Sequence, residues 1–212
     1  MTQFFSVHPQ TPQARLVRRA AEVVRAGGLI AYPTDTSYAL GCRIGDRDAA
    51  ERMRVLRELD PNHHFTLVCL TIAQAAQYAR IDDTRFRIVK QAGAGDFVFI
   101  LLATREVPRR LQHPRRRTIG IRLIGHPVAK ALLEELGEPL LSSTLQLPED
   151  LHPLNDGDEI VARLAGRIDL VLDAGPCGIE PSTVVDLTGQ LPVVVREGKG
   201  RLESIGLVVA DS

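Results

Sequence analysis

The sequence is poor in cysteine and carries no net charge, and both shortages narrow what it can encode. Its 212 residues hold 3 cysteines, and 26 basic residues balance 26 acidic ones. Cys42, Cys69 and Cys177 lie far apart with no Cys-x-x-Cys pair, so we expect neither a disulfide framework nor a zinc site. Reduced thiols buried as small apolar side chains are the simplest interpretation. Without net charge, any electrostatic function must come from local clustering.

Long apolar runs are also missing. No stretch approaches the roughly 20 residues of a membrane-spanning helix. Residues 1–10 lack the basic start and apolar segment that mark a signal peptide. We therefore expect a cytoplasmic protein without a membrane partner. A composition of 44% hydrophobic and 25% charged residues is ordinary for a soluble globular chain, and the length fits one domain.

Apolar periodicity predicts alternating helices and strands. The first helix is expected to start at the Thr11-Pro12 pair and to stop at Gly27. Further helices are expected at 47–59, 72–79, 83–93, 126–137 and 158–166. Strands are expected at 29–33, 65–70, 95–103, 118–123, 139–143, 168–175, 182–188 and 192–198. The pattern predicts a single α/β domain over residues 1–212, on a twisted mixed sheet whose apolar strands are covered by helices, but no strand order.

Polar residues end the apolar strand 29–33. Thr34, Asp35, Thr36 and Ser37 follow Pro33 directly. A turn is the plain interpretation, because these residue types are common in turns. Three hydroxyls and a carboxylate at the end of a buried strand raise the alternative that they hold a ligand.

Two later strands end in a similar way. Ser142, Ser143, Thr144 and Gln146 follow one apolar strand, and Ser182, Thr183 and Arg196 flank the last two. Ligands of open α/β sheets usually bind at strand ends, although capping or turn roles remain the alternative. Because an unpaired charge at a buried strand is costly, Arg196 is expected to meet an internal carboxylate or a bound phosphate.

Arginines gather between residues 104 and 122. Glu106 alone opposes Arg105, Arg109, Arg110, Arg115, Arg116, Arg117 and Arg122. A solvated basic face is the usual interpretation of such a run. In a chain of zero net charge, however, the cluster favours an anionic partner such as a nucleotide or RNA. Few aromatic residues are interleaved, so stacking on single strands is not indicated.

Four blocks occur in one order along the chain. They are Pro-Thr-Asp-Thr at 33–36, Thr-Ile-Gly-Ile-Arg at 118–122, Pro-Leu-Leu-Ser-Ser at 139–143 and Pro-Ser-Thr-Val-Val-Asp-Leu-Thr at 181–188. None is a P-loop, a Gly-x-Gly-x-x-Gly fingerprint or a His-Glu-x-x-His motif. Their order resembles the YrdC-like family, which includes the threonylcarbamoyl-AMP synthases, over roughly residues 12–200. Residues 63–70 and 107–122 resemble its YciO branch.

The resemblance implies a fold, a site and a reaction. The fold would be a twisted mixed sheet with helices around a basic concave cleft. The reaction would join L-threonine, bicarbonate and ATP, the last as a substrate with Mg²⁺, into threonylcarbamoyl-AMP for a tRNA modification. No permanent cofactor or resident metal is implied. Thr34 and Thr36 would hold threonine, Arg122 and Arg196 would contact phosphate, and Ser142, Ser143, Ser182 and Thr183 would line the nucleotide pocket.

Two hallmarks of the synthases are altered here. Their Lys-x-Arg pair falls on residues 58–65, where Leu59 to Pro61 provide neither cation. Arg54, Arg57, His63 and His64 are the candidates to replace it. Their Ser-x-Asn falls on 144–146 or, less well, on 142–144, so the catalytic candidates are Arg57, Thr144 and Gln146. Losing two charged hydrogen bonds of roughly 1.5–3 kcal/mol each would harm catalysis more than binding.

Three hypotheses remain open from the sequence. The first is a threonylcarbamoyl-AMP synthase, slowed by the missing cations. The second is a non-catalytic, RNA- or ribosome-associated protein that binds double-stranded RNA through Arg109, Arg110, Arg115, Arg116 and Arg117. The third is an acyl- or carbamoyl-adenylate enzyme with another substrate. The sequence gives no oligomeric state.

Overall fold

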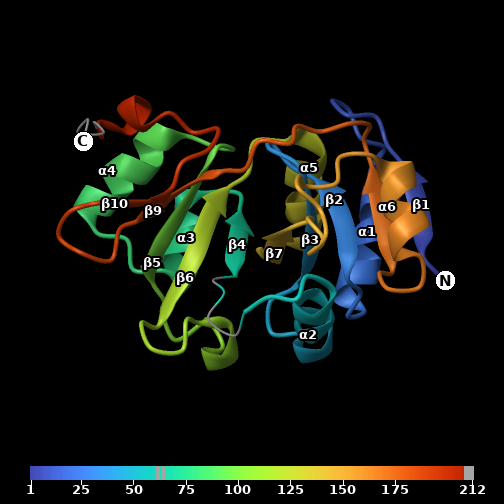
Figure 1. Ribbon diagram of the computed structural model, residues 1–212, viewed down its shortest axis with the longest axis horizontal. Coiled ribbons are helices and arrows are strands. Elements are labelled where there is room, and N and C mark those ends of the chain that lie inside the picture. The colour runs from blue at the N-terminus through green and yellow to red at the C-terminus, as the bar shows by residue number, and fades with distance from the viewer. Residues whose placement is uncertain (61–62, 64, 208–212) are drawn as a thin grey trace.

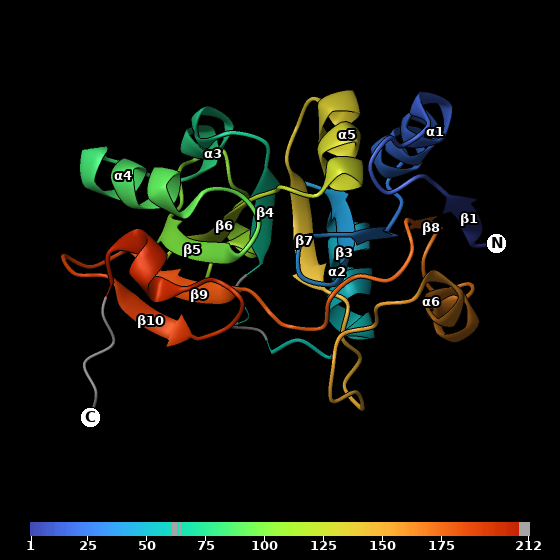
Figure 2. The ribbon, with the colours of Figure 1, turned by 90° about the horizontal axis from the view of Figure 1, so that it is seen from above.

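One mixed sheet organises the chain in the computed structural model, which describes residues 1–60, 63 and 65–207. Its ten described strands follow the order β1-β8-β2-β3-β7-β4-β6-β5-β9-β10. The pairs β1–β8, β2–β8, β4–β6 and β5–β9 are parallel, and the other neighbours are antiparallel. The sheet twists strongly along its length (Figures 1 and 2). The predicted α/β fold on a twisted mixed sheet is thereby confirmed.

The elements largely match the predicted ones, with ends shifted by a few residues. The strands are β1 (Gln3–Ser6), β2 (Ile30–Pro33), β3 (Tyr38–Arg43), β4 (Thr66–Cys69), β5 (Phe97–Leu102), β6 (Thr118–Leu123), β7 (Leu140–Thr144), β8 (Leu170–Asp173), β9 (Thr183–Asp186) and β10 (Val193–Arg196). The α-helices are α1 (Ala14–Arg25), α2 (Arg47–Leu56), α3 (Ile72–Tyr78), α4 (Asp83–Ala92), α5 (Pro127–Leu136) and α6 (Gly157–Leu164). Two short 3₁₀ turns are η1 (Arg109–Leu111) and η2 (Leu202–Ile205).

Side-chain caps explain where several helices begin. The carboxylates of Asp46, Asp82 and Asp156 accept hydrogen bonds from the first turns of α2, α4 and α6, respectively. The predicted start of α1 at Thr11-Pro12 is wrong, because the helix begins at Ala14 without a side-chain cap.

The strands β1 and β3 were not predicted. β3 pairs with β2 in a hairpin and with β7 on its other side. The sequence did not predict β3 because the polar residues before Tyr38 were interpreted as the end of one strand and not as the turn of a hairpin. In this turn the Thr34 amide donates to the Ser37 carbonyl at 3.1 Å.

Helices cover both faces of the sheet (Figure 2). One half of the sheet is formed by β1, β8, β2, β3 and β7. Helices α1 and α5 pack on one face of this half, and α2 and α6 pack on its other face. α3 and α4 pack against the half formed by β4, β6, β5, β9 and β10 (Figure 2). Within the described part of the chain, every helix lacks the length and apolar character needed to cross a bilayer.

The last strand departs from its predicted buried position. β10 forms the edge of the sheet next to β9. Val193 and Val195 are 60% and 56% exposed, whereas Val194 packs against the core. Three consecutive valines suggested a strand that is buried on both faces. In the edge strand β10, however, only the face that carries Val194 packs against the core.

Candidate functional site

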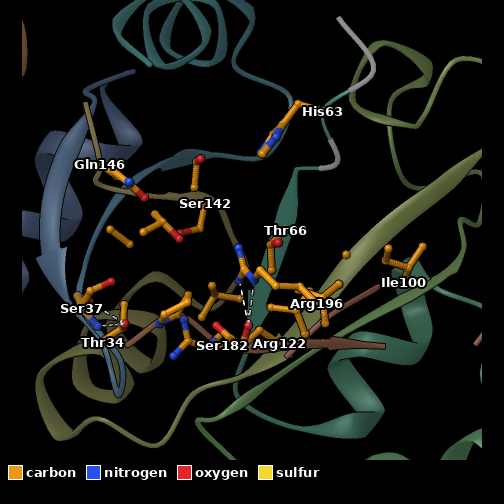
Figure 3. Close-up of a pocket in the computed structure, with 18 of the residues that line it drawn as sticks. Thr34, Ser37, His63, Thr66, Ile100, Arg122, Ser142, Gln146, Ser182 and Arg196 are labelled. Carbon is orange, nitrogen blue, oxygen red and sulfur yellow. Dashed lines mark hydrogen bonds between the residues drawn. The ribbon is translucent and has the colours of Figure 1, made fainter. Parts of the chain in front are cut away.

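A cavity of about 290 Å³ lies between the two halves of the sheet (Figure 3). We call it the central cavity. Hydroxyl and amide side chains line it from the β2–β3 turn and the end of β7. Aliphatic side chains of β5, β9 and β10 line the opposite wall, namely Val98, Ile100, Val184 and Val195. In Figure 3, Arg196 points toward the space between the two walls.

Positive charge dominates the central cavity. Arg57, Arg122 and Arg196 all line it, together with His63. Among the described residues that line the cavity, there is no carboxylate. Three guanidinium groups facing one space without a lining counter-ion make it suited to a ligand of two or more negative charges.

Arg122 is the most deeply held of the three arginines. It extends from β6, is 6% exposed, and donates to the Gly95 carbonyl at 2.9 Å and to Thr36 Oγ1 at 3.0 Å. Its guanidinium lies 3.9 Å from the carboxylate of Asp35, which supplies the internal counter-ion. Burial lowers the pKa of Arg122, and the charge of Asp35 opposes that shift.

Asp35 is itself fixed by close backbone contacts. Its Oδ2 accepts from the Gly125 amide at 2.9 Å, and its carbonyl accepts from Lys199 Nζ at 2.8 Å. A Cβ at Gly125 would lie only 2.5 Å from Asp35 Oδ1, so this approach requires glycine. The carboxylate of the Pro-Thr-Asp-Thr block therefore orients Arg122 from behind rather than lining the cavity.

Arg57 reaches the cavity from the end of α2. Its Nε donates to the Gln146 carbonyl at 2.6 Å, and its Nη1 donates to Ser143 Oγ at 3.0 Å and to the Thr144 carbonyl. Burial lowers the pKa of Arg57 to about 10, and the nearby charge of Arg196 adds to the shift. Arg57 thus stays charged at neutral pH, and an anion between Arg57 and Arg196 would relieve their repulsion.

Arg196 is the least constrained arginine of the cavity. Its guanidinium donates to one acceptor, the Ser182 carbonyl, at 2.8 and 3.2 Å. Partial burial lowers its pKa. The sequence predicted either an internal carboxylate or a phosphate beside this residue. Among the described residues no carboxylate pairs with Arg196, which leaves its charge available to a ligand.

Hydroxyl groups line the wall opposite the aliphatic side chains. Thr34 Oγ1 donates to the Ser37 carbonyl at 2.6 Å, and both residues line the cavity. Ser142 Oγ lies 2.8 Å from the hydroxyl of Tyr32, whose pKa is raised to about 12, mainly by burial. Tyr32 therefore stays protonated and holds Ser142 in place.

The Ser-x-Asn motif of the synthases aligns with residues 144–146 or with residues 142–144, and both alignments place polar side chains in the central cavity. Ser142, Ser143, Thr144 and Gln146 all line it, whereas Leu145 is fully buried in the core. The predicted residues at the end of β7 are therefore brought together, and their roles remain predictions.

Two predicted site residues lie elsewhere. Thr36 is buried and is not among the residues that line the cavity, since its hydroxyl accepts from Arg122. Thr183 is also buried, and its hydroxyl donates to the Gly200 carbonyl at 2.7 Å. Both hydroxyls lie outside the described lining of the central cavity, and their predicted ligand contacts remain predictions. Ser182, in contrast, lines the cavity as predicted.

The candidates to replace the Lys-x-Arg pair of the synthases differ in whether they reach the central cavity. Arg57 and His63 line the central cavity. Arg54 does not, because its guanidinium lies 4.9 Å from the Phe65 ring centroid and pairs with Glu51 at 3.8 Å. Leu59 packs against the core. Pro61 and His64 lie outside the described residues.

The arginine cluster lies outside the central cavity. Of its members, only Arg122 lines that cavity. Arg109, Arg110, Arg115, Arg116 and Arg117 belong to the connection between β5 and β6, which lies below these strands in Figure 1. The basic cleft and the arginine cluster are therefore two separate features.

Several lining residues were not predicted. Thr66, Val98, Ile100, Val184 and Val195 line the cavity without having been singled out. For Val98 and Ile100 the signal was alternation along a strand, but it could not tell which face meets a cavity. Gly120 also lines the cavity, and a side chain there would collide with Thr66, because a Cβ would lie 2.8 Å from Thr66 Oγ1.

The described residues offer no evident metal centre. No group of three or more His, Cys, Asp or Glu gathers among them. Magnesium sites normally use one or two carboxylates together with substrate phosphates. The described lining of the central cavity does not provide such carboxylates.

Residues 22–198 match the Sua5/YciO/YrdC family, described as telomere recombination. The chain belongs to this family. YciO of Escherichia coli K12, an uncharacterised protein, is 48% identical over 200 residues, which cover 94% of this chain and 97% of YciO. The crystal structure of E. coli YciO has a TM-score of 0.94 and covers 97% of this chain and 100% of that chain. The resemblance to the YciO branch is thus confirmed.

Two more distant relatives carry functional names. A threonylcarbamoyl-AMP synthase of Coxiella burnetii is 30% identical over 181 residues, which cover 82% of this chain and 95% of the synthase. The crystal structure of P. abyssi Sua5 complexed with L-threonine has a TM-score of 0.88 at 25% identity and covers 96% of this chain and 60% of that chain. The family therefore includes threonylcarbamoyl-AMP synthases and a member that binds L-threonine.

Proposed function

We propose that the central cavity binds ATP and L-threonine and makes threonylcarbamoyl-AMP at a low rate. The observation that carries the proposal is the convergence of Arg57, Arg122 and Arg196 on a cavity whose described lining has no carboxylate. Such a cavity favours a polyanion over a neutral ligand. The synthase and the threonine complex among the relatives support the choice of reaction.

The proposed chemistry needs no protein nucleophile. The amine of threonine bonds to the carbon of bicarbonate, water leaves, and a carbamate forms. An oxygen of this carbamate then attacks the α-phosphorus of ATP. The new phosphorus–oxygen bond forms as the bond to the β-phosphate breaks, and pyrophosphate leaves. Repulsion between the two anions is the main obstacle. Fixed cations and correct positioning lower that barrier.

Each arginine has a separate role in this proposal. Arg122, held by Asp35 and Thr36, is the fixed cation for the α-phosphate. Arg196, whose one acceptor among the described residues is the Ser182 carbonyl, moves onto the β- and γ-phosphates. Arg57 neutralises charge near the hydroxyls of β7. Thr34 and Ser37, which line the cavity beside Arg122, hold the amino acid.

The hydroxyls at the end of β7 complete the nucleotide pocket in this proposal. Ser142 and Ser143 contact the nucleotide with Ser182 from the other half of the sheet, and Thr144 and Gln146 position the carbamate. Magnesium enters bound to the triphosphate, because the described cavity lining supplies hydroxyls and guanidinium groups rather than carboxylates.

A low rate is expected from the bonds that Arg57 already makes. Three of its donor contacts go to Ser143, Thr144 and Gln146 of the protein itself. It can therefore replace only part of the charge that a Lys-x-Arg pair would bring. Losing transition-state contacts lowers kcat more than it weakens threonine binding.

The direct test is pyrophosphate release with ATP, bicarbonate and each amino acid in turn. We expect slow release that depends on threonine and bicarbonate together. Release with a different amino acid would instead favour an adenylate-forming enzyme with another substrate. ATP binding without release from any mixture would contradict catalysis and favour the second candidate, a nucleotide-binding protein without turnover. The observation in favour of that candidate is the absence of cationic side chains at residues 58–60.

A further inference from the structure

A second basic hollow lies outside the central cavity. It has a volume of about 540 Å³ and opens where β5 ends and the connection to β6 begins. Five arginines line it: Arg80, Arg105, Arg109, Arg116 and Arg117. We call it the arginine hollow. The described residues that line it are all different from those that line the central cavity.

The structure sorts the arginines of the cluster into two groups. Arg109, Arg116 and Arg117 line the hollow, whereas Arg110 and Arg115 do not. Arg110 instead donates to the Gly45 carbonyl. Arg80, which lies more than twenty residues earlier in the sequence, completes the hollow beside Arg105. The five arginines predicted from the sequence to bind RNA therefore include two that lie outside the hollow, Arg110 and Arg115, and omit two that line it, Arg80 and Arg105.

The charge of the arginine hollow is poorly balanced within the protein. Among the described residues, only Arg116 of the five pairs with a carboxylate, that of Asp186, at 3.5 Å. All five arginine residues are exposed. Mutual repulsion of like charges destabilises such a group unless an anion binds there.

The backbone at one of these arginines is held in an unusual conformation. Arg117 has a φ of 53°, in the left-handed region that long side chains rarely adopt. Its amide donates to the His113 carbonyl at 2.9 Å, and its carbonyl accepts from the Ala103 amide at 2.9 Å. These bonds fix the turn that directs Arg117 to the hollow. Strained residues fixed in this way tend to occur at binding sites.

We propose that the arginine hollow binds phosphate groups, as a site separate from the central cavity. Guanidinium groups match phosphate oxygens well, because they donate paired hydrogen bonds and keep their charge. Two sources could supply the phosphates: the backbone of an RNA duplex, or a free oligophosphate. An RNA backbone would extend beyond the hollow and would show a steep dependence on salt.

The test compares two double variants that remove the same charge. Arg80→Gln with Arg109→Gln alters the arginine hollow, and Arg110→Gln with Arg115→Gln removes two neighbouring arginines outside it. Binding of a short fluorescent RNA duplex and of inorganic tripolyphosphate is measured for each variant across a salt series. ATP titration of both variants checks that the central cavity is intact and keeps the two proposals separate.

We expect the hollow variant to bind its probe about tenfold more weakly and the control variant to change by less than about threefold. Loss of duplex binding identifies a nucleic-acid backbone as the source. Loss of tripolyphosphate binding, with no duplex bound by the wild type, identifies a free oligophosphate. Equal losses in the two variants, or no binding of either probe by the wild type, would overturn the proposal.

Discussion

The central cavity and the arginine hollow use the same residue type in two different ways. In the cavity, Arg122 is buried and Arg57 is half-buried, and both donate to carbonyls and hydroxyls of the protein. In the hollow, the arginines are exposed, and among the described residues only Arg116 pairs with a carboxylate. Buried, bonded guanidinium groups hold an anion in one place, whereas exposed ones supply charge with little positional restraint. The first arrangement suits chemistry at a phosphorus atom, and the second suits docking.

The largest effect is expected from removing the buried arginine. Arg122→Met leaves Asp35 without its cation and removes the bonds to Gly95 and Thr36. We expect the free energy of unfolding to fall by about 3 kcal/mol, since breaking a buried ion pair strands a charge. Urea denaturation measures it. Arg109→Met in the arginine hollow is the control and should change stability by less than about 0.5 kcal/mol. Similar losses in both variants would erase the contrast between the two regions.

A smaller effect, on turnover, is expected at the end of α2. Arg57→Gln should lower the rate of pyrophosphate release about tenfold, since a lost charged contact of ~1.4 kcal/mol has that effect. The KM for threonine should change little, because the contact acts on the phosphates. Arg54→Gln, on the same helix but outside the cavity, should leave the rate unchanged. Equal rates of pyrophosphate release for the two variants would show that Arg57 does not take part in the reaction.

The smallest effect is expected from removing magnesium. The guanidinium groups of the cavity neutralise phosphate directly, and the described lining offers no carboxylate to the metal. We expect chelation of Mg²⁺ to weaken ATP binding by less than about threefold, as measured by calorimetry. A loss of more than about thirtyfold would show that a metal ion carries the charge that we assign to the arginines.

The sequence predicted the fold class and about half of the residues that line the central cavity, and it failed where tertiary packing decides. Residues at strand ends, such as Ser142 and Arg196, were recognisable because a polar side chain there is unusual in an apolar strand. Thr36 and Thr183 look the same in sequence, but both lie outside the described lining of the central cavity. Only the tertiary structure shows which of the hydroxyls at strand ends meet the cavity.

The sequence provided a short set of candidates to replace the missing Lys-x-Arg pair, but it could not tell which of them reaches the cavity. Arg54 and Arg57 are one turn apart on the same helix, and the sequence gives no reason to prefer either. The contacts with Phe65 and Glu51 hold Arg54 away from the cavity, whereas Arg57 bonds to the end of β7. The arginine hollow was similarly incomplete, because Arg80 joins it from a distant part of the chain.

The most direct test of the central claim is a calorimetric titration of ATP into three proteins: the wild type, Arg196→Gln and Arg117→Gln. Among the described residues Arg196 is held by a single carbonyl, so its loss should weaken ATP binding at least about tenfold without harming the fold. Arg117 lines the arginine hollow, so its loss should leave ATP binding within about twofold of the wild type. Equal weakening by both substitutions, or no ATP binding to the wild type, would contradict the assignment of the nucleotide to the central cavity.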